Sequence, residues 1–82
     1  MNPLALTPDL LPDMMRRLTP RQLEIVELLA QGKKETEIAP LLSIGVPTIR
    51  GHIQRSCFKL RLENRTQLIV VYAMWRATEN GA

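Results

Sequence analysis

Residues 35–60 read ETEIAPLLSIGVPTIRGHIQRSCFKL. A short amphipathic segment, a turn and a longer amphipathic segment follow one another here. The apolar residues of the longer segment recur at spacings of four, four and three, which places them on one helical face: Ile49, Ile53, Cys57 and Leu60. The pattern predicts two helices, over residues 35–42 and 46–60, joined by the turn Ser43-Ile44-Gly45.

The shorter helix contains a proline. Its inward side is expected to carry Ile38, Leu41 and Leu42. Pro40 removes a backbone hydrogen bond and crowds the preceding turn, at a cost of about 3 kcal/mol in a helix interior. We therefore expect either a late start, with Thr36 as N-cap, or a kink.

A further helix precedes this pair. Thr19 is a good N-cap, Pro20 occupies the first helical position, and Gln22 completes a Thr-x-x-Gln capping box. Gly32 provides a left-handed stop. The sequence predicts a helix over residues 20–31.

The last element is ambiguous on composition alone. The run Leu68–Tyr72 is β-branched and aromatic, which favours a strand. However, Asn64-Arg65-Thr66-Gln67 has the form of a capping box, and the chain offers no second strand to satisfy the backbone of an isolated one. We predict a helix that runs toward Ala77.

The chain divides into three parts. Residues 1–17 hold three of the six prolines and are expected to form an irregular N-terminal arm, with one short helix near residues 12–16. Residues 18–78 form the domain, and residues 79–82 a C-terminal tail. One domain is the most that 82 residues allow.

Composition excludes several classes of protein. The single Cys57 rules out an internal disulfide and is expected to be a core thiol. The longest apolar run, residues 68–75, is far shorter than the roughly 20 residues that span a bilayer. No signal-peptide pattern opens the chain. We expect a soluble cytoplasmic protein with no membrane association.

Basic residues are concentrated in the second half of the chain. Residues 1–46 carry five basic and six acidic side chains, whereas residues 47–82 carry six basic and two acidic ones. A basic face on one element indicates either a polyanionic partner or a solvated helix surface.

A short helix, a tight turn and a helix with an exposed polar face make a helix-turn-helix. The two helices cross closely, so a small residue is needed in the first and an aliphatic one in the second. Ala39 and Ile49 suit these roles. The amino-terminal half of the second helix is then free to enter a major groove.

The chain resembles the LuxR/GerE family of bacterial transcription regulators, in particular its small stand-alone GerE type. The resemblance lies in these motifs: Leu18-Thr19-Pro20-Arg21, Leu23-Glu24, Ala30-x-Gly32, Glu37-Ile38-Ala39, Leu42-x-Ile44, Thr48-Ile49-Arg50-x-His52, Lys59-Leu60-x-Leu62 and Arg65-Thr66-Gln67. It implies an all-α, four-helix DNA-binding domain whose third helix reads the major groove and whose fourth often pairs two copies.

On this basis residues of the third helix are expected to contact double-stranded DNA: Thr48, Arg50, Gly51, His52, Gln54, Arg55 and Lys59. Arg50 either forks onto guanine or a phosphate, or is a solvated arginine. Gln54 either reads adenine or is polar surface. His52, by its match to the family's histidine, contacts a phosphate or sugar, or else packs in the fold. Gly51 offers no side chain for direct readout.

The three remaining polar residues of that set are expected to hold phosphates and set the register: Thr48, Arg55 and Lys59. The last helix is apolar almost all round and needs cover on its second side. Either a second copy supplies it, or the arm from Leu4 to Met15 folds over it. The dimer interface expected in the first case comprises Leu68, Val70, Val71, Met74 and Trp75.

The function predicted is a sequence-selective transcription regulator, cytoplasmic and nucleoid-associated when bound, that acts as a homodimer. The alternative is a protein-interaction module that binds another regulator or RNA polymerase, similar to region 4 of sigma factors or to an anti-activator, with little affinity for DNA. One histidine, one cysteine and no metal-ligand cluster argue against an enzyme and against a cofactor.

Overall fold

The structure is a computed structural model that describes residues 8–79 of the chain. Its elements are a 3₁₀ turn, η2 (Pro8–Leu10), and five helices: α1 (Leu11–Arg16), α2 (Pro20–Ala30), α3 (Glu35–Leu42), α4 (Val46–Leu60) and α5 (Arg65–Glu79). Within residues 8–79 no strand occurs. The all-α fold is confirmed, including a helix where the composition of residues 68–72 favoured a strand.

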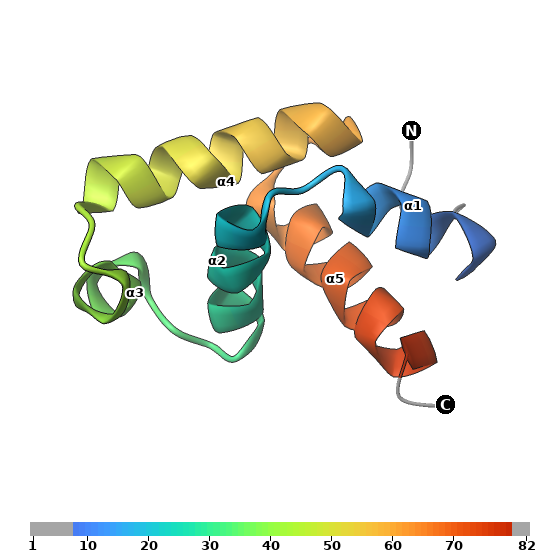
Figure 1. Ribbon diagram of the computed structural model, residues 1–82, viewed down its shortest axis with the longest axis horizontal. Helices are drawn as coiled ribbons and strands as arrows, with labels where there is room; N and C mark the ends of the chain where they lie inside the picture. Colours follow the sequence, from blue (N-terminus) through green and yellow to red (C-terminus); the bar gives the residue numbers. More distant parts are fainter. Residues whose placement is uncertain (1–7, 80–82) are drawn as a thin grey trace.

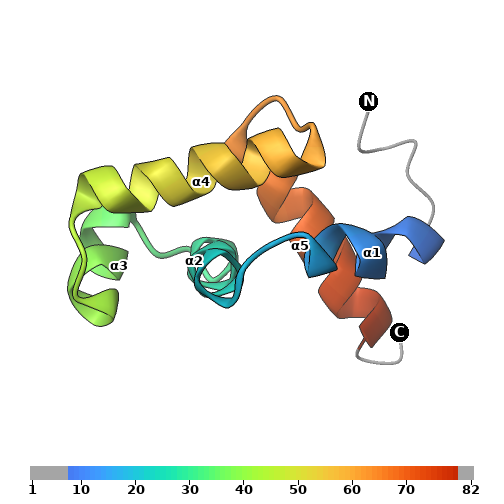
Figure 2. The same cartoon turned by 45° about the horizontal axis from the view of Figure 1, so that its top comes forward.

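α4 lies across one side of the molecule, and α2 and α5 pack beneath it (Figure 1). α3 lies at one end, against the start of α4, and α1 lies at the other end, against α5 (Figures 1 and 2). α3 and the start of α4 therefore lie at the end of the molecule opposite α1 (Figure 1).

The ends of α2 follow the sequence signals closely. The Thr19 side chain accepts a hydrogen bond from the Gln22 backbone N–H at 3.1 Å, and the Gln22 side chain accepts one from the Thr19 N–H at 3.0 Å. This is the predicted capping box, which satisfies two N–H groups that have no partner within the helix. Gly32 follows the helix with φ of 90°, a left-handed conformation that only glycine adopts without steric cost.

α3 has the predicted bounds, but its start and its buried face correct two expectations. Lys34 is the N-cap, so the helix does not begin late to accommodate Pro40. Pro40 is exposed, on the side opposite the buried Ile38. A residue other than proline at position 40 would donate its backbone N–H to the carbonyl of Thr36. Because Pro40 lies on the exposed side of the helix, this carbonyl faces solvent, where water can satisfy it.

Leu41 was expected to point inward and is 61% exposed instead. The buried sector of α3 is centred on Ile38, with Ala39 and Leu42 half-buried and packed against the core. Around the helix axis, Leu41 is turned about 60° from Ile38, in the direction away from Ala39 and Leu42. Because an eight-residue helix that packs against α4 buries only a narrow stripe, Leu41 is left outside it.

The N-terminal arm contributes more to the core than an irregular segment would. It contains the short helix expected near residues 12–16, which begins at Leu11 as α1 and follows the 3₁₀ turn. Leu11 is completely buried and Met15 almost so, in one cluster with Leu68 and Val71 of α5. The arm therefore covers part of α5 within one chain. Residues 1–7, including the start of the expected Leu4–Met15 cover, lie outside the described residues.

α5 begins close to its predicted cap. The Asn64 side chain accepts a hydrogen bond from the Gln67 N–H at 2.9 Å. The Gln67 side chain accepts from the Glu63 N–H at 2.8 Å, one residue earlier than a capping box requires. Cys57 is half-buried beside the core, and burial raises the pKa of its thiol. Among the described helices, none is long and apolar enough to cross a membrane.

Candidate nucleic-acid interface

α4 is fixed by its apolar face and presents the other face outward. Ile49, Ile53 and Leu60 belong to the core, and Gly45 is the N-cap, with Pro47 in the first turn. The small residue expected opposite Ile49, Ala39 of α3, is half-buried against the core. α3, the turn and α4 therefore form a helix-turn-helix in which residues of α4 line an outward surface.

Five of the seven residues predicted to contact DNA are exposed on α4: Thr48, Arg50, Gln54, Arg55 and Lys59. The other two, Gly51 and His52, are half-buried. The structure thus brings the predicted residues together on one helix face. Their contacts with DNA remain a prediction.

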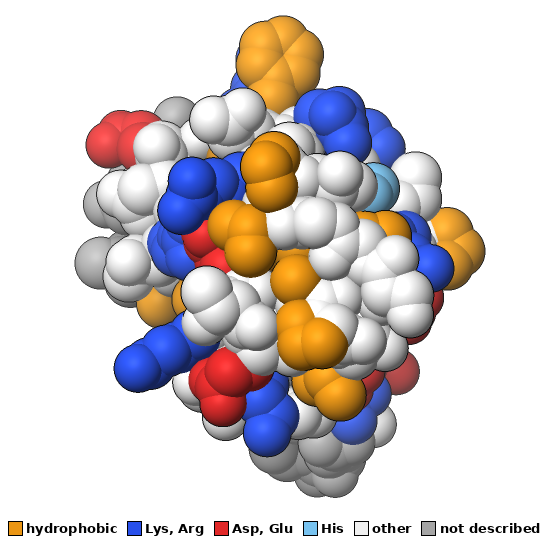
Figure 3. All heavy atoms as spheres, turned by 90° about the vertical axis from the view of Figure 1, so that its left-hand side faces the viewer, with side chains coloured by type: hydrophobic (Ala, Val, Ile, Leu, Met, Phe, Trp, Pro, Cys, Tyr) orange, Lys and Arg blue, Asp and Glu red, His pale blue; other side chains and the backbone are white. Residues whose placement is uncertain are grey.

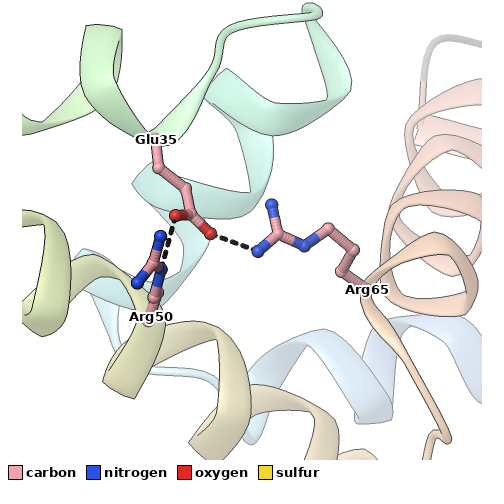
Figure 4. Close-up of polar contacts among 3 residues, drawn as sticks. All are labelled: Glu35, Arg50 and Arg65. Carbon is pink, nitrogen blue, oxygen red and sulfur yellow. Dashed lines mark hydrogen bonds and ion pairs between the residues drawn. The ribbon is translucent and has the colours of Figure 1, made fainter.

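Arg50 does not extend freely into solvent. Its Nε donates a hydrogen bond to Oε2 of Glu35 at 2.8 Å, and Arg65 donates to Oε1 of the same carboxylate (Figure 4). The hydrogen bonds from Arg65 and then from Arg50 hold the pKa of Glu35 below its ordinary value. The carboxylate therefore stays ionised and joins the starts of α3 and α5 to the first half of α4.

Lys59, at the other end of the face, is tied to α2. Its Nζ donates to Oε1 of Gln22 at 3.0 Å, the oxygen that also accepts from the Thr19 backbone. Gln22 is a buried polar residue, and these two hydrogen bonds satisfy its side-chain oxygen. Lys59 consequently has a structural partner as well as an exposed position.

His52 lies at the edge of the face. Its Nδ1 is buried and has no hydrogen-bond partner among the described residues. Burial lowers the pKa of His52, and the positive charges of Arg55, Arg21 and Lys59 lower it further. The imidazole is therefore neutral near pH 7. The positive charges around it would attract an anion.

Two large apolar side chains of the helix-turn-helix are without cover, one on α4 and one on α3. Phe58 is 86% exposed on the outward face of α4, where it lines a shallow hollow with Gln54, Arg55 and Lys59. Leu41 is the second. Figure 3 shows the end of the molecule that α3 and the start of α4 form: hydrophobic side chains run down its middle, with Lys and Arg side chains on both sides.

The face of α5 expected to pair two copies is only partly available. Leu68 and Val71 are completely buried within the single chain, and a side chain with no exposed surface has none to offer a partner. Trp75 packs on the core side, with its ring 5.7 Å from that of Tyr72. The dimer interface on α5 stays a prediction, to which Leu68 and Val71 can add no surface in this conformation, whereas Trp75 is half-buried. Of the predicted set, Val70 is 37% exposed and Met74 half-buried.

Sequence reasoning did not assign any contact to Glu35, Gln22 or Arg65 within the site. Glu35 pairs with residues 15 and 30 positions away. An acidic residue in the first turn of a helix is common because it opposes the helix dipole, so its presence gave no signal of a pairing role. Phe58 is not among the residues that the sequence predicts to contact DNA.

A helix-turn-helix with a polar, basic second helix is typical of the class of DNA-binding regulatory proteins. The chain belongs to the luxR family of bacterial regulatory proteins, whose GerE domain matches residues 16–72. Over the residues the structure describes, no cluster of His, Cys, Asp and Glu side chains is suited to hold a metal ion.

Three curated relatives illustrate the similarity. The spore germination protein GerE of Bacillus subtilis is 43% identical over 53 residues, which cover 65% of this chain and 72% of GerE. The transcriptional regulatory protein DesR of the same organism is 40% identical over 65 residues, 76% of this chain and 33% of DesR. The response regulator protein VraR of Staphylococcus aureus is 33% identical over 58 residues.

The match to VraR covers 71% of this chain and 28% of VraR. The chain thus matches about a third of the length of DesR and of VraR, and most of the length of GerE. No solved structure matches the chain with significant similarity.

Proposed function

We propose that the chain is a sequence-selective DNA-binding transcription regulator that places α4 in the major groove. The observation that carries this proposal is the outward face of α4, where Arg50, Gln54 and Arg55 are exposed on a helix held by its opposite side. A major groove about 12 Å wide admits one such helix. The family and the relatives that are regulators support the same function.

The residues of α4 divide by position. Arg50 and Gln54 stand one turn apart in the first two-thirds of the helix, where side chains reach base edges. Arginine matches O6 and N7 of guanine, and glutamine matches N6 and N7 of adenine. Thr48, Arg55 and Lys59 hold phosphates and fix the register of the helix in the groove.

We further propose that two copies pair through α5, by a smaller face than the sequence indicated. One exposed stripe of α5 consists of small residues and one valine: Thr66, Val70, Ala73 and Ala77. Small side chains let two helices approach closely, and the half-buried Ile69 and Met74 flank this face. A twofold dimer would present two recognition helices to successive major grooves about 34 Å apart.

The pairing is tested by sedimentation or light scattering of the wild-type chain and of Ala73→Glu. Ala73 is exposed, so the added charge leaves the core intact but is placed where a second copy would pack. Ala73→Ser is the matched control and keeps the dimer. A wild-type chain that remains monomeric at micromolar concentration would refute the pairing.

An alternative function is favoured by Phe58 and Leu41. Two large apolar side chains left open to water, one on α3 and one on α4, suit contact with another protein, such as another regulator or RNA polymerase. A pull-down that recovers one stoichiometric partner, together with no measurable affinity for duplex DNA, would support this function over the first. Recovery of DNA alone would reject it.

The primary function is tested by selecting bound duplexes from a random pool. Arg50→Ala is expected to lose preference at one base pair, a contact worth about 1–3 kcal/mol of discrimination. Lys59→Ala is expected to weaken all sequences alike. Arg76→Ala, which removes the same charge from the exposed last turn of α5, is the control and leaves the selected sequence unchanged.

We assign the chain to the cytoplasm and, when bound, to the nucleoid.

A further inference from the structure

A single carboxylate joins three helices next to the proposed DNA surface. Glu35 stands in the first turn of α3, and only 12% of its side chain is exposed. It accepts one hydrogen bond from Arg50 of α4 and one from Arg65 of α5, each on a different oxygen (Figure 4). Charge-assisted hydrogen bonds of this kind are stronger and better directed than neutral ones.

The bond from Arg50 uses one particular nitrogen. Nε donates to Glu35, while the two amino groups at the end of the guanidinium make no hydrogen bond within the described residues. The Arg50 side chain remains 64% exposed. Its stem is therefore held by the protein, and the four N–H donors at its tip are left for another acceptor.

An arginine held in this way loses less rotamer freedom when it binds. A free arginine explores many rotamers and must give them up to form a two-pronged contact with guanine. The Glu35 carboxylate already selects one arrangement. Arg65, bound to the second oxygen, keeps the carboxylate ionised and prevents it from rotating away.

We propose that Glu35 is a positioning residue that sets the sequence specificity of α4 by directing the tip of Arg50 at one base pair. The proposal rests on the proposed function, since it requires that α4 read DNA. It adds that a residue outside α4, with no contact to DNA of its own, determines how selectively Arg50 reads.

The proposal predicts opposite effects on the overall affinity for duplex DNA and on the preference for the selected sequence. Glu35 carries a negative charge beside the proposed DNA surface, so its removal is expected to strengthen binding to any duplex. The same removal frees Arg50 and weakens the preference for the selected sequence. A purely structural role would instead weaken binding to every sequence together.

The experiment compares Glu35→Gln with the wild type on two duplexes, the selected sequence and a scrambled one, by fluorescence anisotropy at fixed salt. Glutamine keeps the length of the side chain and an acceptor oxygen but not the charge. We expect tighter binding to the scrambled duplex and a fall of about tenfold in the ratio of the two affinities, within the range that one bidentate contact supplies. An unchanged ratio would overturn the proposal.

Glu37→Gln is the matched control. Glu37 stands in the same first turn, and among residues 8–79 its carboxylate accepts only from the Lys34 backbone N–H, at 2.9 Å, a bond that glutamine also makes. It loses the same charge, so both affinities should rise alike and their ratio should stay within about twofold. A ratio that falls equally in both variants would mean that charge alone acts, and would overturn the proposal.

Two further measurements separate the mechanism from its alternatives. In the Arg50→Ala background, Glu35→Gln should leave the ratio unchanged, because Glu35 acts through Arg50; a further fall would contradict this. If Glu35→Gln does not fold, Glu35→Asp keeps the charge but is one methylene too short to reach both guanidiniums, and the same fall in ratio is expected. A wild-type chain that binds neither duplex would refute the proposed function itself.

Discussion

The guanidinium of Arg55 lies over Gly51: a β-carbon at Gly51 would stand 3.3 Å from Nη1 of Arg55 and 3.6 Å from Nη2. The side chain of Arg55 thus fills the space that a side chain at position 51 would occupy. Gly51 therefore does not leave a gap in the outward face of α4. It lets a basic group from the next turn lie near the middle of that face.

Replacement of Gly51 tests this relationship. Gly51→Ala should raise the free energy of unfolding by about 0.5–1 kcal/mol, because glycine in a helix interior costs about that much relative to alanine. The new methyl group displaces the flexible tip of Arg55 by only a few tenths of an ångström. Urea unfolding measures the gain, and the same substitution in Arg55→Ala, where nothing need move, is the control. A loss of stability in both backgrounds would contradict this geometry.

His52 predicts a pH dependence of stability. Its pKa is lowered in the folded chain, so below its ordinary value of 6.5 the unfolded chain binds more protons than the folded one. Stability should therefore be unaffected by His52 above about pH 7.5 and should decrease as the pH falls through 6.5. Urea unfolding at pH 7.5 and pH 5.5 measures this, and His52→Gln should remove the decrease. An equal decrease in His52→Gln would assign it to other groups.

A buried and an exposed residue of α3 should differ greatly in the cost of truncation. Ile38→Ala should destabilise the chain by about 2–5 kcal/mol, because Ile38 is completely buried. Leu41→Ala should change stability by no more than about 0.5 kcal/mol, since Leu41 is mostly exposed. Thermal unfolding of both variants checks the orientation of α3. A large loss in Leu41→Ala would mean that this residue is buried, in one chain or against a partner.

The junction of η2 and α1 offers a similar pair of neighbours. Leu11→Ala should cost about 2–5 kcal/mol, because Leu11 is completely buried in the cluster that includes α5. Leu10→Ala should cost much less, since Leu10 is 44% exposed. Equal and small effects of the two substitutions would show that residues 8–16 do not cover α5 in solution.

Local signals in the sequence were sufficient for most of the helices. The capping box of Thr19 and Gln22 is formed by side chains at the start of α2, and the bounds of α4 match those that its apolar spacing and the preceding turn predict. The inward face of α4 follows from its apolar spacing. Each of these features depends on neighbours along the chain, which is why the sequence alone predicts them.

What the sequence did not predict depends on packing between helices. The exposure of Leu41 follows from the angle at which α3 meets α4, and no pattern within α3 determines that angle. The burial of Leu68 and Val71 depends on α1 and α2 reaching α5. The pairing of Glu35 with Arg65 joins residues 30 positions apart. In each case the relevant neighbour is distant in sequence, so local periodicity carries no record of it.

The most direct measurement of DNA binding through α4 is the salt dependence of duplex affinity for the wild type and for the double variant Arg55→Ala, Lys59→Ala. The logarithm of the wild-type affinity should fall steeply with the logarithm of salt concentration, by about 0.9 per neutralised phosphate, and the double variant should have a slope shallower by about 2. Arg16→Ala, Arg76→Ala loses the same charge from exposed positions outside α4 and should keep the wild-type slope. Equal slopes in all three chains, or no binding at low salt, would contradict this role of α4.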